Sequence, residues 1–413
     1  MKTLKMLTLF LTSLSLLIAC EKDDVVPKDA TFEGGDVSGV WAKNTTYKVE
    51  GHIIVPQGQS LTIEEGVTVI MADTSLKIEI IVYGNLYCKG TAENPVRITI
   101  DENLRTTANA MAGLWGGILC ATSAGEILLD HTIVEYAGAV TTEESPSVQR
   151  GLYKAEAGER LPALWTSNTQ GKVVIKNSTI RNMAEDCFYL EGGKIIIMNN
   201  TFHTSGVSGG EAVNIKSGCI ADVAFNLFYS PNTNALKLSN SDLREPQATV
   251  NAYNNTMLNC GWRRPSVKGG SVWIEDNVNA KIFNNLFANC RFGIKNDEAD
   301  SRSVYDYNLF YGYNQTCVDQ FQTTTSKVVR GEHDVAGTTA GDTDPKFVNY
   351  PLNTDMFNTE FNTSWNFRLQ SASPAIGKGT TTISGNLTSG ISVGGVTYTS
   401  PAPSTTIGAF GTN

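Results

Sequence analysis

A recurring segment carries the side chains that are best placed to do chemistry. It has a small or polar residue followed by apolar–X–apolar–X, and its copies lie between residues 163 and 295. Period-two alternation turns the apolar positions inward and the X positions outward, so the X residues of successive copies form two neighbouring rows on one face. The first row is Trp165, Tyr189, Asn214, Lys237, Trp273 and Gly293, and the second is Ser167, Glu191, Lys216, Ser239, Glu275 and Lys295.

These two rows predict a glycan-binding face. Exposed aromatic rings on a rigid surface stack on sugar rings, and lysine and glutamate hydrogen-bond hydroxyl or carboxylate groups. The alternative is an ordinary solvated sheet covered by loops, with its charges paired between copies. We expect a polysaccharide or oligosaccharide as the partner, bound by Trp165, Tyr189, Glu191, Asn214, Lys216, Lys237, Trp273, Glu275 and Lys295.

Catalysis on a glycan would need a more compact set of groups. A lyase needs a Lys or Arg base with a lowered pKa. Hydrolysis needs two or three converging carboxyl groups. Glu191 and Glu275 share a row but lie three copies apart, or about 14 Å at parallel-strand spacing, which is too far for an acid–base pair. No catalytic residue is therefore named: the first hypothesis is a glycan-binding or adhesive protein, and the alternative is a polysaccharide lyase or glycoside hydrolase.

Metal and cofactor signals are weak. The histidines share no metal-binding spacing, and there is no CxxC motif. We expect no cofactor; calcium is a candidate only at two acidic clusters, Asp297–Asp300 and Asp342–Asp344, for which solvated turns are the alternative. Cys260 and Cys290 follow apolar anchors in consecutive repeats, where buried thiols are expected and a disulfide is the alternative.

A second repeat predicts the fold. A polar residue, most often Asn, precedes an apolar anchor at intervals of 22, 26, 29, 30 and 23 residues, counted from Ile180. A variable period above 20 residues is typical of a solenoid with loops of changing length. Stacked amides can each donate and accept, which makes a buried polar column tolerable. The column is predicted to contain Ser178, Asn200, Asn226, Asn255, Asn285 and Asn308, with His131 as a candidate earlier member.

The N-terminus predicts export and a lipid anchor. Lys2 and Lys5 precede an apolar run that is too short to span a bilayer. Leu17-Ile18-Ala19-Cys20 resembles a bacterial lipobox, which implies cleavage before Cys20 and acylation of its thiol. The acidic Glu21–Asp24 stretch resembles the surface-export signal of Bacteroidota-type lipoproteins. We therefore expect a signal peptide at 1–19, a lipidated cysteine and linker at 20–34, and an outer-membrane protein exposed at the cell surface.

The charge excludes one class of partner. The whole chain carries a net charge of -9, and removal of Lys2 and Lys5 leaves 30 basic against 41 acidic residues, or -11. A strongly acidic chain does not attract nucleic acid or an anionic membrane face, so membrane contact is expected through the anchor alone.

Several further segments resemble the right-handed parallel β-helix superfamily that includes pectate lyases and many surface lipoproteins. Trp41 and Ile53–Gly66 resemble the opening coil, and Gly90–Val96 and Leu114–Ile118 the next ones. The resemblance implies an all-β solenoid with end caps, a single domain at 35–413, and a cleft on the sheet face that carries the two rows. It identifies a fold that hosts many functions. Similar terminal segments are Asp344–Phe347, Phe367–Gly377 and Ile407–Gly411, whereas 139–160 and 381–402 fit no coil and are expected to be insertions or end structure.

Overall fold

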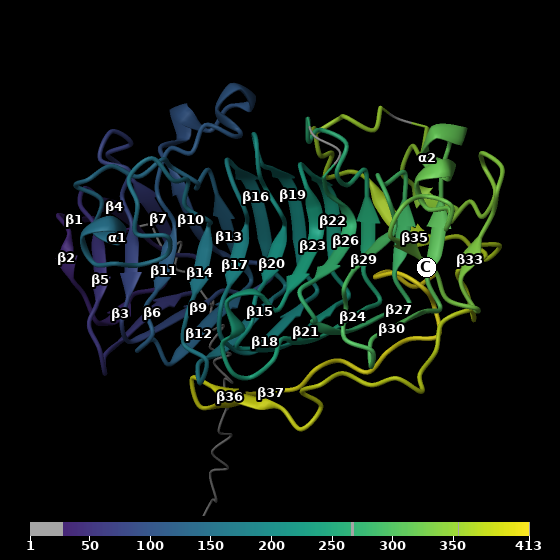
Figure 1. The fold of residues 1–413 in the computed structure, drawn as a ribbon. Coiled ribbons are helices and arrows are strands. Elements are labelled where there is room, and N and C mark those ends of the chain that lie inside the picture. The colour runs from purple at the N-terminus through teal and green to yellow at the C-terminus, as the bar shows by residue number, and fades with distance from the viewer. Residues whose placement is uncertain (1–27, 266–267, 354, 413) are drawn as a thin grey trace, which may run out of the picture.

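The computed structural model describes residues 28–265, 268–353 and 355–412 (Figure 1). The predicted signal peptide, Cys20 and the acidic Glu21–Asp24 segment lie outside these residues. Within the described ranges, no helix has the length and hydrophobicity required for a membrane span.

The described chain winds through three long sheets in turn, so that each coil adds one strand to each sheet. Sheet A contains β1(Lys28–Phe32), β4(Thr45–Val49), β7(Thr68–Met71), β10(Val96–Ile100), β13(Thr132–Glu135), β16(Thr179–Met183), β19(Thr201–Ser205), β22(Leu227–Pro231), β25(Thr256–Leu258), β28(Leu286–Ala288), β31(Leu309–Tyr311) and β33(Val335–Ala336). Sheet B contains β2(Gly35–Asp36), β5(Ile53–Val55), β8(Ile80–Val82), β11(Ile118–Cys120), β14(Leu164–Thr166), β17(Phe188–Leu190), β20(Val213–Ile215), β23(Asn234–Ser239), β26(Gly270–Glu275), β29(Ile294–Asp297) and β32(Val328–Val329). Sheet C contains β3(Gly39–Trp41), β6(Ser60–Glu64), β9(Asn85–Lys89), β12(Glu126–Asp130), β15(Lys172–Lys176), β18(Gly193–Met198), β21(Cys219–Ala224), β24(Thr249–Tyr253), β27(Asn279–Phe283) and β30(Val304–Asp306). All neighbouring strands of these three sheets are parallel except the last pair of sheet B, β29 and β32.

The predicted all-β parallel solenoid is therefore confirmed. The solenoid begins earlier than expected. A linker was predicted up to residue 34, but β1 already pairs with β4 within that segment. The described cysteines are free buried thiols, as expected for Cys260 and Cys290.

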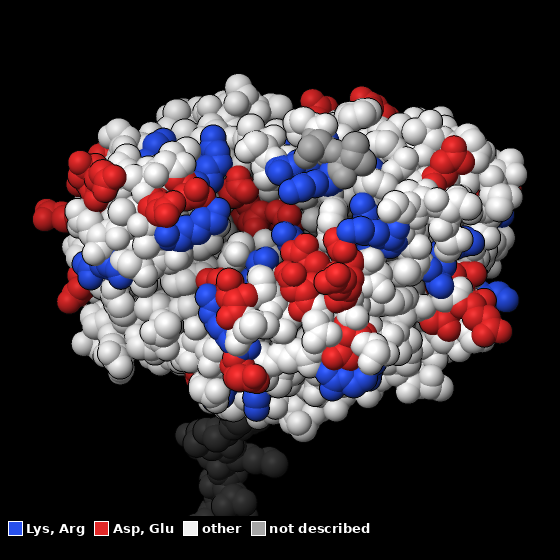
Figure 2. All heavy atoms as spheres, viewed as in Figure 1, with Lys and Arg blue, Asp and Glu red and all other residues white. Residues whose placement is uncertain are grey.

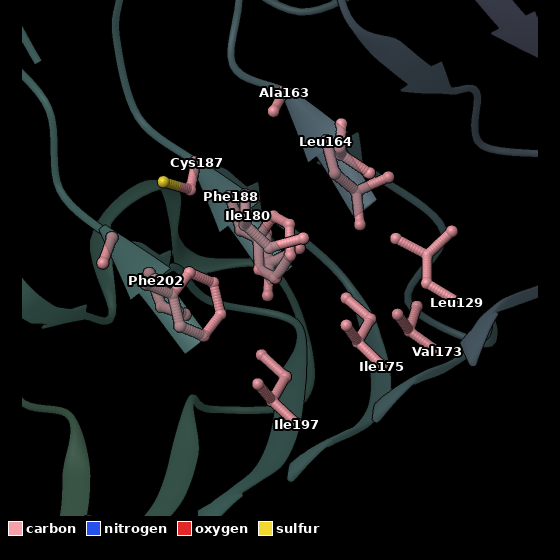
Figure 3. Close-up of a cluster of buried hydrophobic side chains, with 14 of the residues drawn as sticks. Leu129, Ala163, Leu164, Val173, Ile175, Ile180, Cys187, Phe188, Ile197 and Phe202 are labelled. Atoms are coloured by element: carbon pink, nitrogen blue, oxygen red, sulfur yellow. The ribbon is translucent and has the colours of Figure 1, made fainter. Parts of the chain in front are cut away.

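The core is a set of stacked columns inside the coil (Figure 3). Parallel register places Leu164 beside Phe188, and Ile180 beside Phe202 in the neighbouring sheet. Each of these side chains is almost fully buried. Because every coil repeats the inward positions, one continuous core forms along the whole axis.

The predicted polar column lies at the turn between sheets C and A. Asn226 donates its backbone N–H and its side-chain Nδ2 to Oδ1 of Asn255, both at 3.0 Å, and Asn255 bonds in the same way to Asn285. The ladder continues through Asn200 and Asn308, and each member is buried. The amide ladder is confirmed.

The two ends of this ladder differ from the sequence expectation. At its start, Ser178 Oγ accepts from the backbone N–H of Thr132 at 3.0 Å. Thr132 therefore occupies the slot assigned to His131, which lies one residue earlier and contacts Asp130 instead. At the far end, the carboxylate of Asp334 accepts from the backbone N–H of Asn308 at 2.7 Å.

The 139–160 insertion packs over sheet B. It contains α1(Pro146–Gln149), and its Leu152 clusters with Leu161, just after the insertion, and with Trp165. The buried carboxylate of Glu79 fastens it by accepting from the backbone N–H of Ser147 at 2.8 Å and from its hydroxyl at 3.0 Å. The insertion thus forms one wall above the predicted binding face.

The chain after the last coil packs back on the helix. A short helix, α2(Gln315–Gln320), places Val318 on the end of the core, and a hairpin of β34(Phe347–Asn349) and β35(Asn366–Leu369) follows. Residues 381–402 then run back along sheet C, where β36(Ile391–Val393), paired with β37(Val396–Tyr398), packs against β12 and β15 (Figure 1). This segment, which we call the C-terminal strap, lies over the middle coils and not only at the end. The remaining short elements are 3₁₀ turns at Glu102–Leu104, Thr107–Asn109 and Ser241–Leu243.

Candidate functional site

The first predicted row is stacked as expected over most of its length. Trp165 pairs with Tyr189, Tyr189 with Asn214, Asn214 with Lys237, and Lys237 with Trp273. The last member is Lys295 and not Gly293, because β29 begins at Ile294 and pairs two residues further along than expected. Phe292, just before it, adopts the left-handed conformation (φ 56°), which ends the alternation assumed from the sequence. Asp297 accordingly takes the place in the second row that was assigned to Lys295.

The expected exposure of Trp165 is wrong. Only 5% of its surface is accessible, because Leu152 and Tyr153 of the insertion pack on it together with Leu161, which follows the insertion. Its Nε1–H donates to Oε2 of Glu191 at 2.6 Å. Glu191 is also buried and pairs with Arg244 at 3.0 Å. These predicted ligands form a packed network beneath the insertion, so they cannot stack on a sugar without its displacement.

At the opposite end of the row, Lys295 is also buried. Its ammonium lies 4.5 Å from the ring centre of Trp273 and 4.2 Å from that of Phe292. Burial is the main reason that its pKa is lowered. Trp273 and Glu275 remain partly exposed, as do Tyr189 and Lys237. The middle of the row is therefore the part that can meet a ligand.

A groove of about 510 Å³ lies over this middle part. Tyr189, Asn214, Lys216 and Lys237 line its floor, and the insertion supplies one wall. The loop at 208–211 supplies the other. Figure 2 shows a hollow in the middle of this face in which acidic side chains lie, with basic side chains around it.

Four acidic residues line the groove: Glu159, which pairs with Lys154 in the wall at 2.6 Å, and the cluster of Glu185, Asp186 and Glu211. The members of this cluster lie in consecutive turns between sheets A and B, where Cys187 donates its backbone N–H to the carbonyl of Glu211 at 2.9 Å. Oδ1 of Asp186 accepts the backbone N–H of Glu211 at 2.8 Å, and its Oδ2 accepts from Nδ2 of Asn214 at 3.1 Å. The carboxyl of Glu211 lies close enough to Asp186 that both its charge and a side-chain interaction with it favour the protonated form of Asp186.

Burial and mutual repulsion change the protonation of this cluster. Burial, followed by the charge of Glu211, raises the pKa of Glu185 to about 7. The same two causes, in the same order, raise the pKa of Asp186 well above its usual range. Desolvation penalises the charged form, and neighbouring carboxylates cannot all ionise at once. The cluster therefore holds at least one proton at neutral pH.

The position of Glu185 depends on Gly209. A Cβ atom at residue 209 would lie 2.0 Å from Oε1 of Glu185, so only glycine lets the loop approach the carboxyl this closely. Asn232 fixes the loop by donating Nδ2 to the carbonyl of Gly209 at 2.6 Å.

Cations line the same groove. Burial, and then the charge of Lys237, lowers the pKa of Lys216, whose ammonium lies 5.7 Å from the ring centre of Tyr189. Burial disfavours the charged form of Lys237, but the carboxylate of Glu275, 3.1 Å away, stabilises it. The pKa of Lys237 is raised overall. Arg160 and Arg264 lie in the walls, and their charges lower the pKa of Glu185.

A smaller cavity of about 140 Å³ continues the groove along the helix axis. It shares Glu211, Lys237 and Arg264 with the groove and adds Trp273. The indole Nε1 of Trp273 is buried and has no hydrogen-bond partner among the described residues. The two hollows together suit an elongated ligand.

The predicted calcium clusters do not come together in the structure. Asp297 pairs with Lys327 at 2.6 Å, and Asp300 pairs with Arg302 at 2.7 Å. Among the described residues, no group of three or more His, Cys, Asp or Glu side chains is arranged to hold a metal ion.

Two family models match the chain. Residues 35–145 match the family described as a pectate-lyase-like β-helix domain, and residues 163–331 match the family described as a right-handed β-helix region. The coil is a right-handed β-helix. A fold of the pectate-lyase-like kind is associated with polysaccharide substrates, which favours a carbohydrate-related function. No curated protein and no solved structure matches the chain.

The acidic cluster in the groove of this β-helix was not predicted from the sequence. Glu185, Asp186 and Glu211 lie in turns, outside the strands whose alternation defined the two rows. One signal could have found two of them: Asp186, Glu211 and Asn234 each stand immediately before a copy of the repeated segment. Residues at an equivalent slot of a parallel coil stack about 4.8 Å apart. That slot predicts a column of acids, but not the pairing that shifts their pKa values.

Proposed function

We propose that the protein hydrolyses an extended glycan in the groove, with Glu185, Asp186 and Glu211 as its acid–base groups. The observation that supports this proposal is the convergence of these carboxyl groups from consecutive turns in one hollow. Hydrolysis of a glycosidic bond needs a protonated carboxyl for the leaving oxygen and a carboxylate that activates water.

The protonation of the cluster suggests a role for each member. Glu185, with a pKa of about 7, is the general acid that protonates the glycosidic oxygen. After it has given up its proton, the charges of Arg160 and Arg264 stabilise its carboxylate. Asp186, whose pKa is raised well above its usual range, stays protonated beside Glu211, and the carboxylate of Glu211 accepts the proton of the attacking water.

The long hollow favours a polymer over a single sugar. Trp273 and Tyr189 lie three register steps apart, with Lys237 and Asn214 between them, so their rings are about 14 Å apart along the axis at parallel-strand spacing. Partly exposed rings at both positions can stack on separate sugar units. Of the residues predicted from the sequence, Tyr189, Asn214, Lys216, Lys237, Trp273 and Glu275 remain the proposed ligand contacts.

The proposal is tested with the purified protein and a panel of polysaccharides. We expect new reducing ends without unsaturated products, and we expect Glu185→Gln to lower kcat by about 100-fold or more, because general acid catalysis contributes that much. Glu298→Gln is the matched control, since Glu298 is an exposed acid outside the groove. Cleavage that survives Glu185→Gln at the wild-type rate would reject the assigned acid.

A lyase is the second candidate, because burial and Lys237 give Lys216 the lowered pKa that a catalytic base requires. In that case the products would carry an unsaturated uronate, and Lys216→Met would abolish them. Binding of a glycan with no new ends of either kind would favour a non-catalytic, glycan-binding or adhesive protein.

We also propose that acylated Cys20 anchors the protein in the outer membrane, with the β-helix at the cell surface. The lipobox-like sequence Leu17–Cys20 supports the anchor, and Glu21–Asp24 supports surface export. Cys20→Ala should release the protein from membranes or block its maturation, which fractionation would show. Removal of Glu21–Asp24 should lower protease shaving of intact cells while acylation persists; equal shaving of both forms would reject surface export.

A further inference from the structure

A second cavity, of about 480 Å³, opens over sheet A. Its walls come from residues 105–111, from strands β16 and β19, and from residues 359–361 of the C-terminal region. The described residues that line it are all different from those that line the groove. It is therefore a separate hollow, with its own set of side chains.

Within the described chain, Arg181 has donors left for this cavity. The buried carboxylate beside it is that of Glu135, whose Oε1 accepts from Arg97 at 2.7 Å and from Thr99 at 2.8 Å. Oε2 of Glu135 accepts from Nε of Arg181 at 2.6 Å. The terminal N–H groups of Arg181 donate to no described residue, so they can serve a ligand.

The charge of Arg105 is compensated less well than that of Arg181. Its ion pair with Glu102 spans 3.9 Å, and the Glu102 side chain is 88% exposed. Nε of Arg105 is buried and has no hydrogen-bond partner in the described chain. A guanidinium in this state has donors and charge that an incoming anion can satisfy.

The surroundings add further positive charge. Arg263 lies behind the wall, 3.8 Å from Sδ of Met111, and its hydrogen bonds go to backbone carbonyls, including that of Gly206. The cavity lining itself contains a single acid, Glu360, which is exposed at the rim. Counting Glu102, Glu135 and Glu360 against Arg97, Arg105, Arg181 and Arg263 leaves one uncompensated positive charge.

His203 adds a hydrogen-bond acceptor. Thr204 donates its hydroxyl to the carbonyl of Thr359 at 2.7 Å, so its oxygen must accept from Nδ1–H of His203 at 3.1 Å. Nε2 of His203 is then unprotonated. Burial, followed by the charge of Arg181, lowers the pKa of His203 to about 3, which keeps the ring neutral. Phe361 stacks on the ring at 4.4 Å and holds its orientation.

We propose that this cavity is a second binding site for an acidic saccharide, with the acidic group on Arg105 and Arg181 and a sugar hydroxyl donating to Nε2 of His203. An inorganic anion would use only the arginines, and a neutral sugar would use only the histidine, whereas an acidic saccharide satisfies both. The inference is independent of the hydrolytic role proposed for the groove, because the two hollows share no described residue.

Calorimetric titration with glucuronate, glucose and inorganic sulfate tests the assignment. Glucuronate should bind, and glucose should bind at least about tenfold more weakly, because charge-assisted hydrogen bonds are worth that much. Arg105→Gln should weaken glucuronate binding by a similar factor, and Glu360→Gln, which removes the acid at the rim, should strengthen it. Glu298→Gln is the charge-matched control at an exposed site elsewhere, and thermal melts confirm that each variant is folded.

Three results would overturn the proposal. The first is equal affinity for glucose and glucuronate, and the second is an Arg105→Gln variant that binds glucuronate like the wild type. The third is binding of sulfate without binding of glucuronate, which would leave an anion site with no role for His203. Glu211→Gln should leave glucuronate affinity unchanged, and a loss of binding in that variant would place the ligand in the groove instead.

Discussion

Two turns of this β-helix stack polar residues in the same way, with opposite results. At the turn between sheets C and A, every amide from Asn200 to Asn308 donates to one neighbour and accepts from the other. At the turn between sheets A and B, Asp186 and Glu211 stack as carboxyls, and burial together with the charge of Glu211 raises the pKa of Asp186 well above its usual range. A stacked amide stabilises the coil because it is both donor and acceptor. Stacked carboxyls are acceptors only, so they stay partly protonated and can then donate a proton in acid catalysis.

The largest expected effect comes from a break in the amide ladder. Asn255→Leu removes the acceptor of Asn226 and the donor to Asn285. Each buried polar group left unsatisfied costs about 1–3 kcal/mol, so the free energy of unfolding should fall by about 3 kcal/mol or more. Chemical denaturation measures this loss. Asn94→Leu, at an exposed side chain, is the control, and equal stability of the two variants would contradict the role of the ladder.

The acidic column should respond in the opposite direction. Folded-state pKa values of Asp186 and Glu185 are raised, so their contribution to stability is lost as pH rises through those values. Asp186→Asn should therefore stabilise the fold at pH 8, by on the order of 2 kcal/mol, and much less at pH 5. Asn214 can reorient to meet the new amide, because its Oδ1 has no partner in the described chain.

Glu211→Gln should move the pH dependence of glycan cleavage. The charge of Glu211 helps to raise the pKa of Glu185, so without it that pKa should fall, and cleavage should be lost at a lower pH than in the wild type. A pH profile of kcat/KM measures this shift. An unchanged profile would show that Glu185 and Glu211 are not coupled.

A smaller effect is expected at the far end of the amide ladder, where the last group is a carboxyl. Asp334 ends the amide ladder, and burial raises its pKa from 3.8 to about 6. The stability that it contributes when protonated is lost as pH rises toward and through 6. Asp334→Asn, which keeps the acceptor for Asn308, should raise stability at pH 8 by about 1–2 kcal/mol and leave it unchanged near pH 4. Urea denaturation at both pH values measures the difference; destabilisation at pH 8 would mean that the ladder needs a charged end.

The smallest expected effect concerns ligand binding. Trp273→Ala removes a partly exposed ring, and aromatic stacking contributes on the order of 1 kcal/mol beyond area burial, so glycan affinity should fall several-fold. Trp165→Ala is the comparison, because that ring is buried under the insertion and should affect stability more than binding. A larger loss of affinity in Trp165→Ala would mean that the insertion opens to admit the glycan.

The fold could be predicted from the sequence to the extent that each feature repeats. The amide slot from Asn200 to Asn308 and the inward anchors recur in every coil, so their stacking follows from the period alone. The register failed at Lys295, where the left-handed Phe292 delays the start of β29. Neither the burial of Trp165 nor the groove could be predicted, because both depend on the 139–160 insertion, which has no periodic pattern and whose anchor, Glu79, is 68 residues away from Ser147.

The C-terminal strap changes how the whole helix should unfold. A solenoid whose coils touch only their neighbours can lose coils one at a time from either end. Here the backbone N–H of Gly394 donates to Glu126 at 2.8 Å, and Ser400 donates to the buried carboxyl of Asp222. These contacts join segments 268 and 178 residues apart in the chain. The last coils cannot open unless the strap also leaves the middle coils, so the helix should melt as one cooperative unit. The middle coils should reach full stability only after the strap has been synthesised.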